Sequence, residues 1–353
     1  MSKSPKIAAL LLLGFLFGPW PQEALADCVV EGKVGTDGRA LKFSLGAGCT
    51  EAEREARAVD MSTVLEALRQ GRAVELSGVV VRGDLVFDAM PLTPHPPAVE
   101  GIANPLGKEV RVVAGAVSIV NSIVRGTIRH QSAQGQLVFQ GPVTLSGTTF
   151  EQPVDLSRSV FAQPVTLSGA IFLRESYFVQ GEFAREVAAE KTAFGPHTRF
   201  HRSHFHGPAA FQQSGFSGLA EFLEIVFDRE ANFSRTYFKL GTGFSGSRFG
   251  GLADFSEALF DGDAFFTFTR FDGDAFFRRA TFRATADFDD AQFNAREDFS
   301  KVFFEKGPQF AGAKRSSQPP AMTGIENPQI QYAITLSLLV FSAVLIAYLI
   351  RSR

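Results

Sequence analysis

The feature that most constrains the fold is a ladder of phenylalanines running from Phe194 to Phe310. Its steps alternate between five and six residues without interruption. A helix with such a period would need apolar residues three and four positions apart, so the spacing excludes one. The residues that flank each phenylalanine are mostly polar, and the residue two positions earlier is often alanine, which is typical of a very short strand. The predicted core includes Phe233, Phe244, Phe255, Phe266, Phe277, Phe288 and Phe299.

One such unit cannot bury its own phenylalanine, whereas stacked coils can, so the pattern predicts a repeat solenoid. Units such as Ala253-Asp-Phe-Ser-Glu257 and Ala231-Asn-Phe-Ser-Arg235 resemble the pentapeptide-repeat family, whose unit is Ala-Asp/Asn-Leu/Phe-Ser/Thr-X. The resemblance implies an all-β solenoid, a right-handed quadrilateral β-helix with one unit on each side. Every second unit here has a sixth residue, so each coil combines two shorter and two longer units, with the extra residue at two of the four corners.

The ladder sets the expected bounds of the solenoid at residues 72–310. Leu76, Val81 and Phe87 already follow the spacing, and a Pro-rich insertion at residues 90–105 then interrupts it. Aliphatic residues precede phenylalanine at the equivalent positions, so we expect the core to change from aliphatic to aromatic along the axis. At the spacing of paired strands, the part after the insertion forms a rod roughly 40–45 Å long.

Residues 1–26 have the features of a signal peptide. Lys3 and Lys6 are followed by an apolar run from Ile7 to Phe17, and Ala24-Leu25-Ala26 forms a cleavage motif. The sequence therefore predicts export, with an uncleaved anchor left open as an alternative. A lipoprotein signal ending at Cys28 fits less well, because an aspartate comes directly before the cysteine.

Residues 27–71 are expected to form an N-terminal cap. Cys28 and Cys49 are the two cysteines of the chain, and export to an oxidising compartment predicts a disulfide between them. Thr50 and Glu53 form a capping box that starts a helical stretch, and a second helix is expected from about residue 62 to 70. Because the first coil of a solenoid exposes its core and its strand edges, we expect this segment to cover them.

The C-terminal residues predict a membrane anchor. Residues 332–350 contain no charged side chain and are long enough to cross a bilayer as a helix. Arg351 and Arg353 follow, which places residues 351–353 in the cytoplasm. Residues 311–331 form the linker, and the bulk of the chain lies on the periplasmic or lumenal side of a bacterial inner membrane or another internal bacterial membrane. The alternative for residues 332–350 is a buried core helix.

One cluster of side chains predicts a metal site. Four of the six histidines fall within ten residues, at His197, His201, His204 and His206. His204 and His206 flank Phe205 and therefore point outward from the same strand. A coil of this length places Glu182 beside His204 and Asp228 beside His206, a set that suits Zn²⁺ or Cu²⁺. The alternative is a group of surface histidines that holds no ion.

The sequence favours a binding role over catalysis. A net charge of −2 argues against a nucleic-acid partner, and the chain lacks a phosphate-loop, Gly-x-Ser-x-Gly or His-Glu-x-x-His motif, so we predict no enzyme and no cofactor. The leading hypothesis is a non-enzymatic, membrane-tethered scaffold or protein-binding rod with an unknown protein partner, and a homodimer is left open. The alternatives are a metal-binding protein using the histidine patch, and a DNA-mimicking, topoisomerase-binding pentapeptide protein, which export disfavours.

Overall fold

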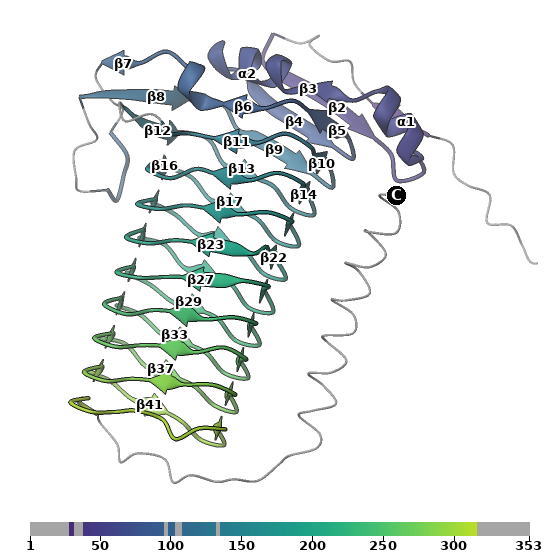
Figure 1. Cartoon of the computed structure of the whole chain (residues 1–353). Coiled ribbons are helices and arrows are strands. Elements are labelled where there is room, and N and C mark those ends of the chain that lie inside the picture. The colour runs from purple at the N-terminus through teal and green to yellow at the C-terminus, as the bar shows by residue number, and fades with distance from the viewer. Residues whose placement is uncertain (1–27, 32–37, 95–97, 103–107, 132–134, 316–353) are drawn as a thin grey trace, which may run out of the picture.

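The computed structural model shows a β-solenoid of stacked coils with few helices (Figure 1). It describes residues 28–31, 38–94, 98–102, 108–131 and 135–315. Four sheets run along the axis, here called sheets A to D in the order in which each coil passes through them. Neighbouring coils pair in parallel, which confirms the predicted all-β solenoid.

Sheets A and C lie on opposite sides of the coil. Sheet A contains β1 (Val30–Glu31), β2 (Ala40–Leu45), β4 (Ala73–Ser77), β9 (Val117–Val120), β13 (Val143–Thr144), β17 (Val165–Thr166), β21 (Val187–Ala188), β25 (Ala209–Ala210), β29 (Ala231–Asn232), β33 (Ala253–Asp254), β37 (Ala275–Phe276) and β41 (Glu297–Asp298). Sheet C contains β6 (Leu85–Val86), β11 (Ile128–Arg129), β15 (Val154–Asp155), β19 (Ser176–Tyr177), β23 (His197–Arg199), β27 (Leu219–Glu221), β31 (Thr242–Gly243), β35 (Ala264–Phe265) and β39 (Ala286–Asp287).

Sheets B and D form the other two sides. Sheet B contains β3 (Val59–Asp60), β5 (Val80–Arg82), β10 (Ile123–Val124), β14 (Thr149–Phe150), β18 (Ile171–Phe172), β22 (Ala193–Phe194), β26 (Gly215–Phe216), β30 (Tyr237–Phe238), β34 (Leu259–Phe260), β38 (Thr281–Phe282) and β42 (Phe303–Phe304). Sheet D contains β7 (Thr93–Pro94), β8 (Glu109–Val113), β12 (Gln136–Phe139), β16 (Ser159–Phe161), β20 (Glu182–Phe183), β24 (His204–Phe205), β28 (Val226–Phe227), β32 (Arg248–Phe249), β36 (Arg270–Phe271) and β40 (Gln292–Phe293).

The core consists of phenylalanine rings stacked from coil to coil. Phe255 is completely buried, and its ring stacks nearly parallel on Phe233 and Phe277, with centroids 5.1 and 5.0 Å away. Phe244 and Phe266 meet the same ring edge-on at 5.2 and 5.4 Å. The predicted core phenylalanines are all buried, as expected. Each stacked partner lies one full coil of four units away along the chain, which confirms the coil length that the sequence predicts.

The core changes from aliphatic to aromatic along the axis, as predicted. Under sheet A, the inward positions pass from Leu145 and Leu167 to Ala189 and then to Phe211. From Phe211 to Phe299 this position holds a stacked phenylalanine in every coil, and the inward position two residues earlier holds alanine as far as Ala275.

The five-residue steps turn through one left-handed residue, two positions after the buried ring. The position is occupied by Arg202 (φ 56°), Arg235 (φ 57°) and Gly246 (φ 69°), among others. A side chain makes this conformation unfavourable by about 1–2 kcal/mol. Each such residue directs its amide at the next coil: Arg202 N–H donates to the Leu223 carbonyl and Arg235 N–H to that of Ser256, both at 2.9 Å. The hydrogen bond between coils therefore accompanies the unfavourable turn.

Two helices cover the N-terminal end of the solenoid (Figure 1). Helix α1 (Glu51–Ala56) begins with the predicted capping box, in which Thr50 and Glu53 exchange hydrogen bonds. Helix α2 (Met61–Arg69) buries Met61, Val64, Ala67 and Leu68 in the same core as the first coils. A short 3-10 helix, η1 (Phe87–Ala89), follows β6. Helix α2 thus closes the core at this end, whereas α1 buries none of its residues.

The cap segment also belongs to the sheets. Strand β2 pairs in parallel with β4, so the cap supplies a strand to sheet A, and β1 pairs with β2 in the antiparallel direction. A disulfide joins Cys28 to Cys49, as the sequence predicts.

The C-terminal coil ends with an ion pair inside the core. Strand pairing continues to Lys314, and Arg315 follows at the inward position one coil after Phe293. The Arg315 guanidinium lies 4.5 Å from the centroid of the Phe310 ring and 3.3 Å from the Glu297 carboxylate, which occupies a position held by alanine in earlier coils. Both side chains are buried, at 7% and 0% exposure. A charged pair therefore takes the place of the next aromatic layer.

The predicted signal peptide (1–26), transmembrane helix (332–350) and tail (351–353), and the linker beyond Arg315, lie outside the described residues. In the part of the chain that the structure describes, no helix has both the length and the apolar character needed to span a membrane.

The stacked rings give a direct prediction for stability. Phe255→Ala removes a ring that contacts six other phenylalanine rings, and we expect a loss of roughly 3–5 kcal/mol in the free energy of unfolding. Phe268→Ala is the matched control, because Phe268 is 67% exposed at a turn and its loss should change stability by less than about 0.5 kcal/mol. Denaturant unfolding followed by circular dichroism measures both. Equal losses in the two variants would contradict the stacked core.

The terminal ion pair gives a second prediction. Glu297→Ala leaves the Arg315 charge buried without its carboxylate, and we expect the last coils to lose about 3 kcal/mol of local stability. Hydrogen exchange in residues 286–314 measures this loss. Changing Arg315→Phe together with Glu297→Ala should restore protection, because a ring at this inward position continues the stack one coil after Phe293. Unchanged exchange in the single variant would show that the pair does not close the core.

Candidate functional site

The outer face of sheet D changes character along the axis. Val138 of β12 and Val160 of β16 point outward and yet are fully buried. The next residues in the same register are Glu182 and His204, and the residue after them is Val226. A short polar stretch therefore lies between valines on this face.

The Pro-rich insertion explains the buried valines. Val99 and Ile102 of the insertion pack against Val110, Val138 and Val160, forming a small apolar cluster outside the main core. Strand β7 pairs antiparallel with β8 and covers the first edge of sheet D. The insertion thus lies on the outer face of sheet D.

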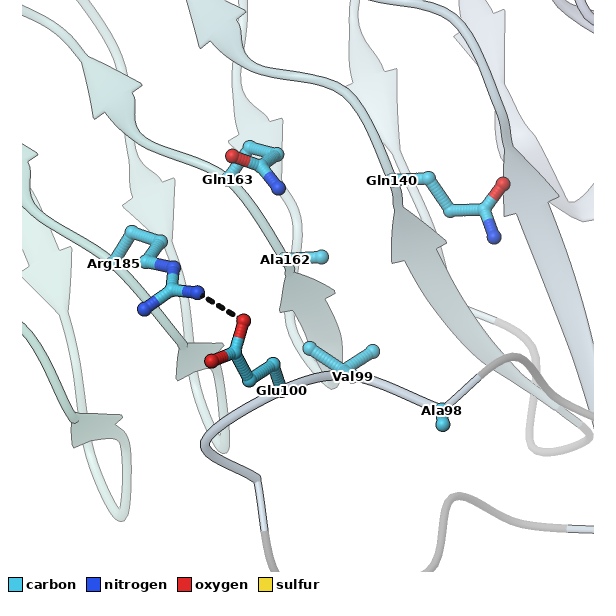
Figure 2. A pocket seen from close by; sticks show the side chains of 7 residues that line it. All are labelled: Ala98, Val99, Glu100, Gln140, Ala162, Gln163 and Arg185. Atoms are coloured by element: carbon cyan, nitrogen blue, oxygen red, sulfur yellow. Dashed lines mark hydrogen bonds and ion pairs between the residues drawn. The ribbon is translucent and has the colours of Figure 1, made fainter.

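A groove follows the edge of the insertion. Figure 2 shows Glu100 of the insertion reaching Arg185 on the solenoid, with a distance of 2.6 Å between the charged groups. The cavity beside this pair has a volume of about 230 Å³ and is lined by Ala98, Val99, Glu100, Gln140, Ala162, Gln163 and Arg185. The Glu100 side chain is 86% exposed, so the pair lies open to solvent.

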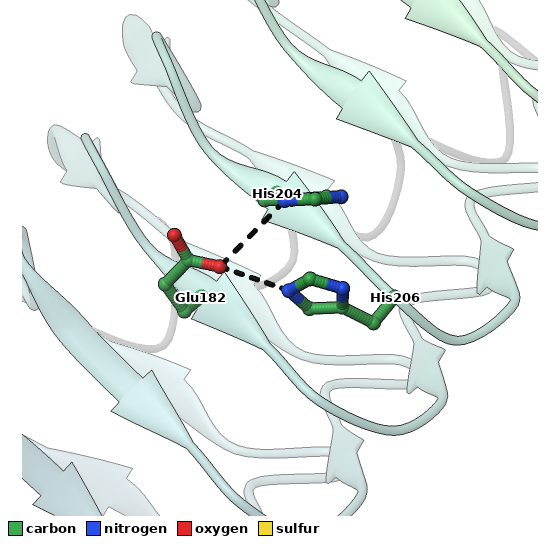
Figure 3. Close-up of side chains that lie close together, drawn as sticks. All are labelled: Glu182, His204 and His206. Carbon is green, nitrogen blue, oxygen red and sulfur yellow. Dashed lines mark hydrogen bonds and ion pairs between the residues drawn. The ribbon is translucent and has the colours of Figure 1, made fainter. Parts of the chain in front are cut away.

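Three of the four predicted metal residues, Glu182, His204 and His206, form one cluster on the outer face of sheet D (Figure 3). Glu182 Oε2 lies 3.0 Å from His206 Nε2 and 3.8 Å from His204 Nδ1. The two imidazole rings face each other, with centroids 3.7 Å apart. One ligand atom from each of these three residues lies within 4.8 Å of the other two. The chemistry available here is the binding of a cation by two nitrogens and one oxygen.

Asp228 lies on the other side of the two rings. Its Oδ2 atom is 2.9 Å from His204 Nε2 and 3.1 Å from His206 Nδ1, the ring nitrogens that face away from Glu182. The structure brings together all four side chains that the sequence predicts as neighbours. It also shows that Glu182 lies on one side of the two imidazole rings and Asp228 on the other.

The remaining two histidines of the run lie elsewhere. His197 is on sheet C, where its Nε2 is 3.3 Å from Glu221, and Arg199 donates to the same ring nitrogen. His201 lies at the following turn, 4.0 Å from Glu224. Because the chain turns a corner every five or six residues, histidines that are close in sequence lie on different faces. Of these four histidines, His204 and His206 share the face of sheet D.

Further along sheet D, the outer face carries charged pairs. Burial opposes the ionisation of Asp272, but hydrogen bonds from Arg270, Asn294 and Arg248 outweigh it and lower the pKa of this carboxyl to about 2. The carboxylate is therefore charged throughout the physiological range and remains paired with arginine. These arginine contacts distinguish it from Asp228, whose partners are imidazoles.

Sequence reasoning missed the groove and the packing of the insertion. The available signal was the run of valines at outward positions of β8, β12 and β16, where neighbouring coils carry polar residues. Outward valines in a strand indicate that something covers them.

Comparisons with protein-family models, with curated proteins and with solved structures gave no match. The class that the fold and the site define is a four-sheeted β-solenoid with a capped N-terminal end, an insertion on one face and a histidine–carboxylate cluster beside it.

Proposed function

We propose that the protein is a non-enzymatic binding rod of the pentapeptide-repeat type, a right-handed coil tethered to a bacterial inner membrane or another internal bacterial membrane. Its solenoid stands on the periplasmic or lumenal side, and its partner is another protein. The observation that carries the proposal is the insertion on sheet D, which gives an otherwise repetitive rod one distinctive surface.

The order of elements along the chain supports this arrangement. The last described coil ends at Arg315, and the predicted span begins at residue 332. Anchoring through the C-terminal segment would leave the N-terminal coils farthest from the bilayer. The insertion belongs to those coils, so a tethered rod would hold it away from the lipid surface and accessible to a partner.

The groove next to the insertion suits the contact surface of a protein. It combines exposed charged groups, Glu100 and Arg185, with the amide side chains of Gln140 and Gln163. Polar groups of both signs on a rigid support favour a specific contact with a complementary polypeptide. We call this surface, residues 98–102 with Gln140, Gln163 and Arg185, the recognition region.

The membrane tether can be tested by fractionation. We expect the full chain in the membrane fraction, with its solenoid digested by protease added to the outer side of spheroplasts. Deletion of residues 332–350 should release the protein into the soluble exported fraction, because the deletion removes the apolar span. A chain that stays soluble with residues 332–350 intact, or is protected from external protease, would contradict the topology.

The recognition region can be tested by site-specific photo-crosslinking in intact cells. A photoreactive residue at Gln163 should give an adduct of defined mass, since Gln163 is exposed within the groove. The matched control is Lys239, an exposed residue that follows β30 on sheet B, the opposite side of the rod. An adduct of twice the chain mass would identify a second copy as the partner. Identical adducts at both positions, or none at Gln163, would overturn the assignment.

A further inference from the structure

We propose that Glu182, His204 and His206 bind one divalent transition-metal ion of the Zn²⁺ class, with Asp228 orienting both imidazoles from outside the coordination shell. The ligand atoms are Oε2 of Glu182, Nδ1 of His204 and Nε2 of His206 (Figure 3). This site is separate from the recognition region and does not depend on the identity of the partner.

The distances fit a tetrahedral ion. Zinc bonds of about 2.0–2.1 Å to nitrogen and oxygen place neighbouring ligand atoms about 3.4 Å apart. The glutamate oxygen lies 3.0 Å from one ligand nitrogen and 3.8 Å from the other, on either side of that value. The three ligand atoms lie within 4.8 Å of one another, and rotation of the side chains can bring them onto one ion. Two imidazoles and one carboxylate also favour zinc or copper over calcium and magnesium, which take oxygen ligands.

Asp228 supplies the support that metal-binding histidines need. A ligating imidazole usually donates its second N–H to a carboxylate, which fixes the tautomer and the ring orientation. Asp228 Oδ2 is placed to accept from Nε2 of His204 and from Nδ1 of His206. Each ring then presents a lone pair toward Glu182. The sequence suggests Asp228 as a fourth ligand, whereas the geometry gives it this orienting role.

The charges also favour an ion. The two imidazoles lie between the carboxylates of Glu182 and Asp228, which are 3.0 Å from His206 and 2.9 Å from His204. Both carboxylates attract a divalent cation to this position.

The support of the site is rigid and its surface is open. Glu182 and His204 are register partners on the adjacent strands β20 and β24. The next residue of each strand, Phe183 and Phe205, points into the core, where the two rings stack with centroids 4.5 Å apart. The side chains remain partly exposed, from 15% at His206 to 31% at His204. An ion can therefore enter without opening the fold. Three protein ligands leave a fourth position for water or for a group from another molecule.

The test is titration of the purified full chain with Zn²⁺ by calorimetry, and with Co²⁺ by visible absorption. We expect one ion per chain and the intense absorption of tetrahedral Co²⁺. His204→Ala and His206→Ala should abolish binding, and the Gln variants at these positions serve as replacements if an Ala variant fails to fold. His201→Ala is the matched control, because His201 lies three residues away with a similar exposure of 28% and outside the cluster.

Asp228→Asn separates the two roles of this residue. As an orienting residue, its loss should weaken the affinity about 10–100-fold and preserve the Co²⁺ spectrum and the stoichiometry. A changed spectrum would make Asp228 a ligand and overturn its assigned role. No saturable binding in the wild type, or binding that survives both His204→Ala and His206→Ala, would overturn the site itself.

Discussion

The structure depends on ring-on-ring stacking between successive coils. A phenylalanine such as Phe255 contacts rings above, below and beside it, so its position is fixed by neighbours one coil away in both directions. A shift of one residue would turn the rings outward and the polar residues inward along the whole strand. The aromatic core therefore sets the register of every sheet, and through the register it sets which outward side chains become neighbours.

The outward positions are not under this constraint, and the types of residue that occupy them change along the axis. On sheet D, valines lie under the insertion, the histidine–carboxylate cluster follows, and arginine–aspartate pairs such as Arg248 with Asp272 continue. Each group is assembled from residues one coil apart, as Glu182 and His204 are. A local contact on the surface is thus a long-range contact in sequence, held in place by a core that does not take part in it.

Much of this arrangement could be predicted from the sequence. With a constant period, the number of a residue tells which side of the coil it lies on and which residue lies beside it in the next coil. The ladder indicates the coil length, the buried phenylalanines and the meeting of His204 with Glu182. It does not indicate the side of the imidazole rings on which Asp228 lies, because that depends on side-chain torsions rather than on register. The burial of Arg315 was equally hidden, since an arginine at the end of a repeat is usually in solvent. The packing of Val99 and Ile102 depends on an insertion that has no period.

Two different periods coexist in this molecule, and they have unequal consequences for its shape. The pattern of phenylalanine spacings repeats every half coil, whereas the chain returns to the same side only after a whole one. Tandem duplication of a whole coil between the insertion and His204 would lengthen the rod by about 4.8 Å and leave both surfaces on one side. Duplication of half a coil would preserve every buried ring and yet carry the histidines to the opposite side from the insertion. The insertion and the histidines therefore share one side only if an even number of half coils is added between them. The packing of the core does not enforce that number.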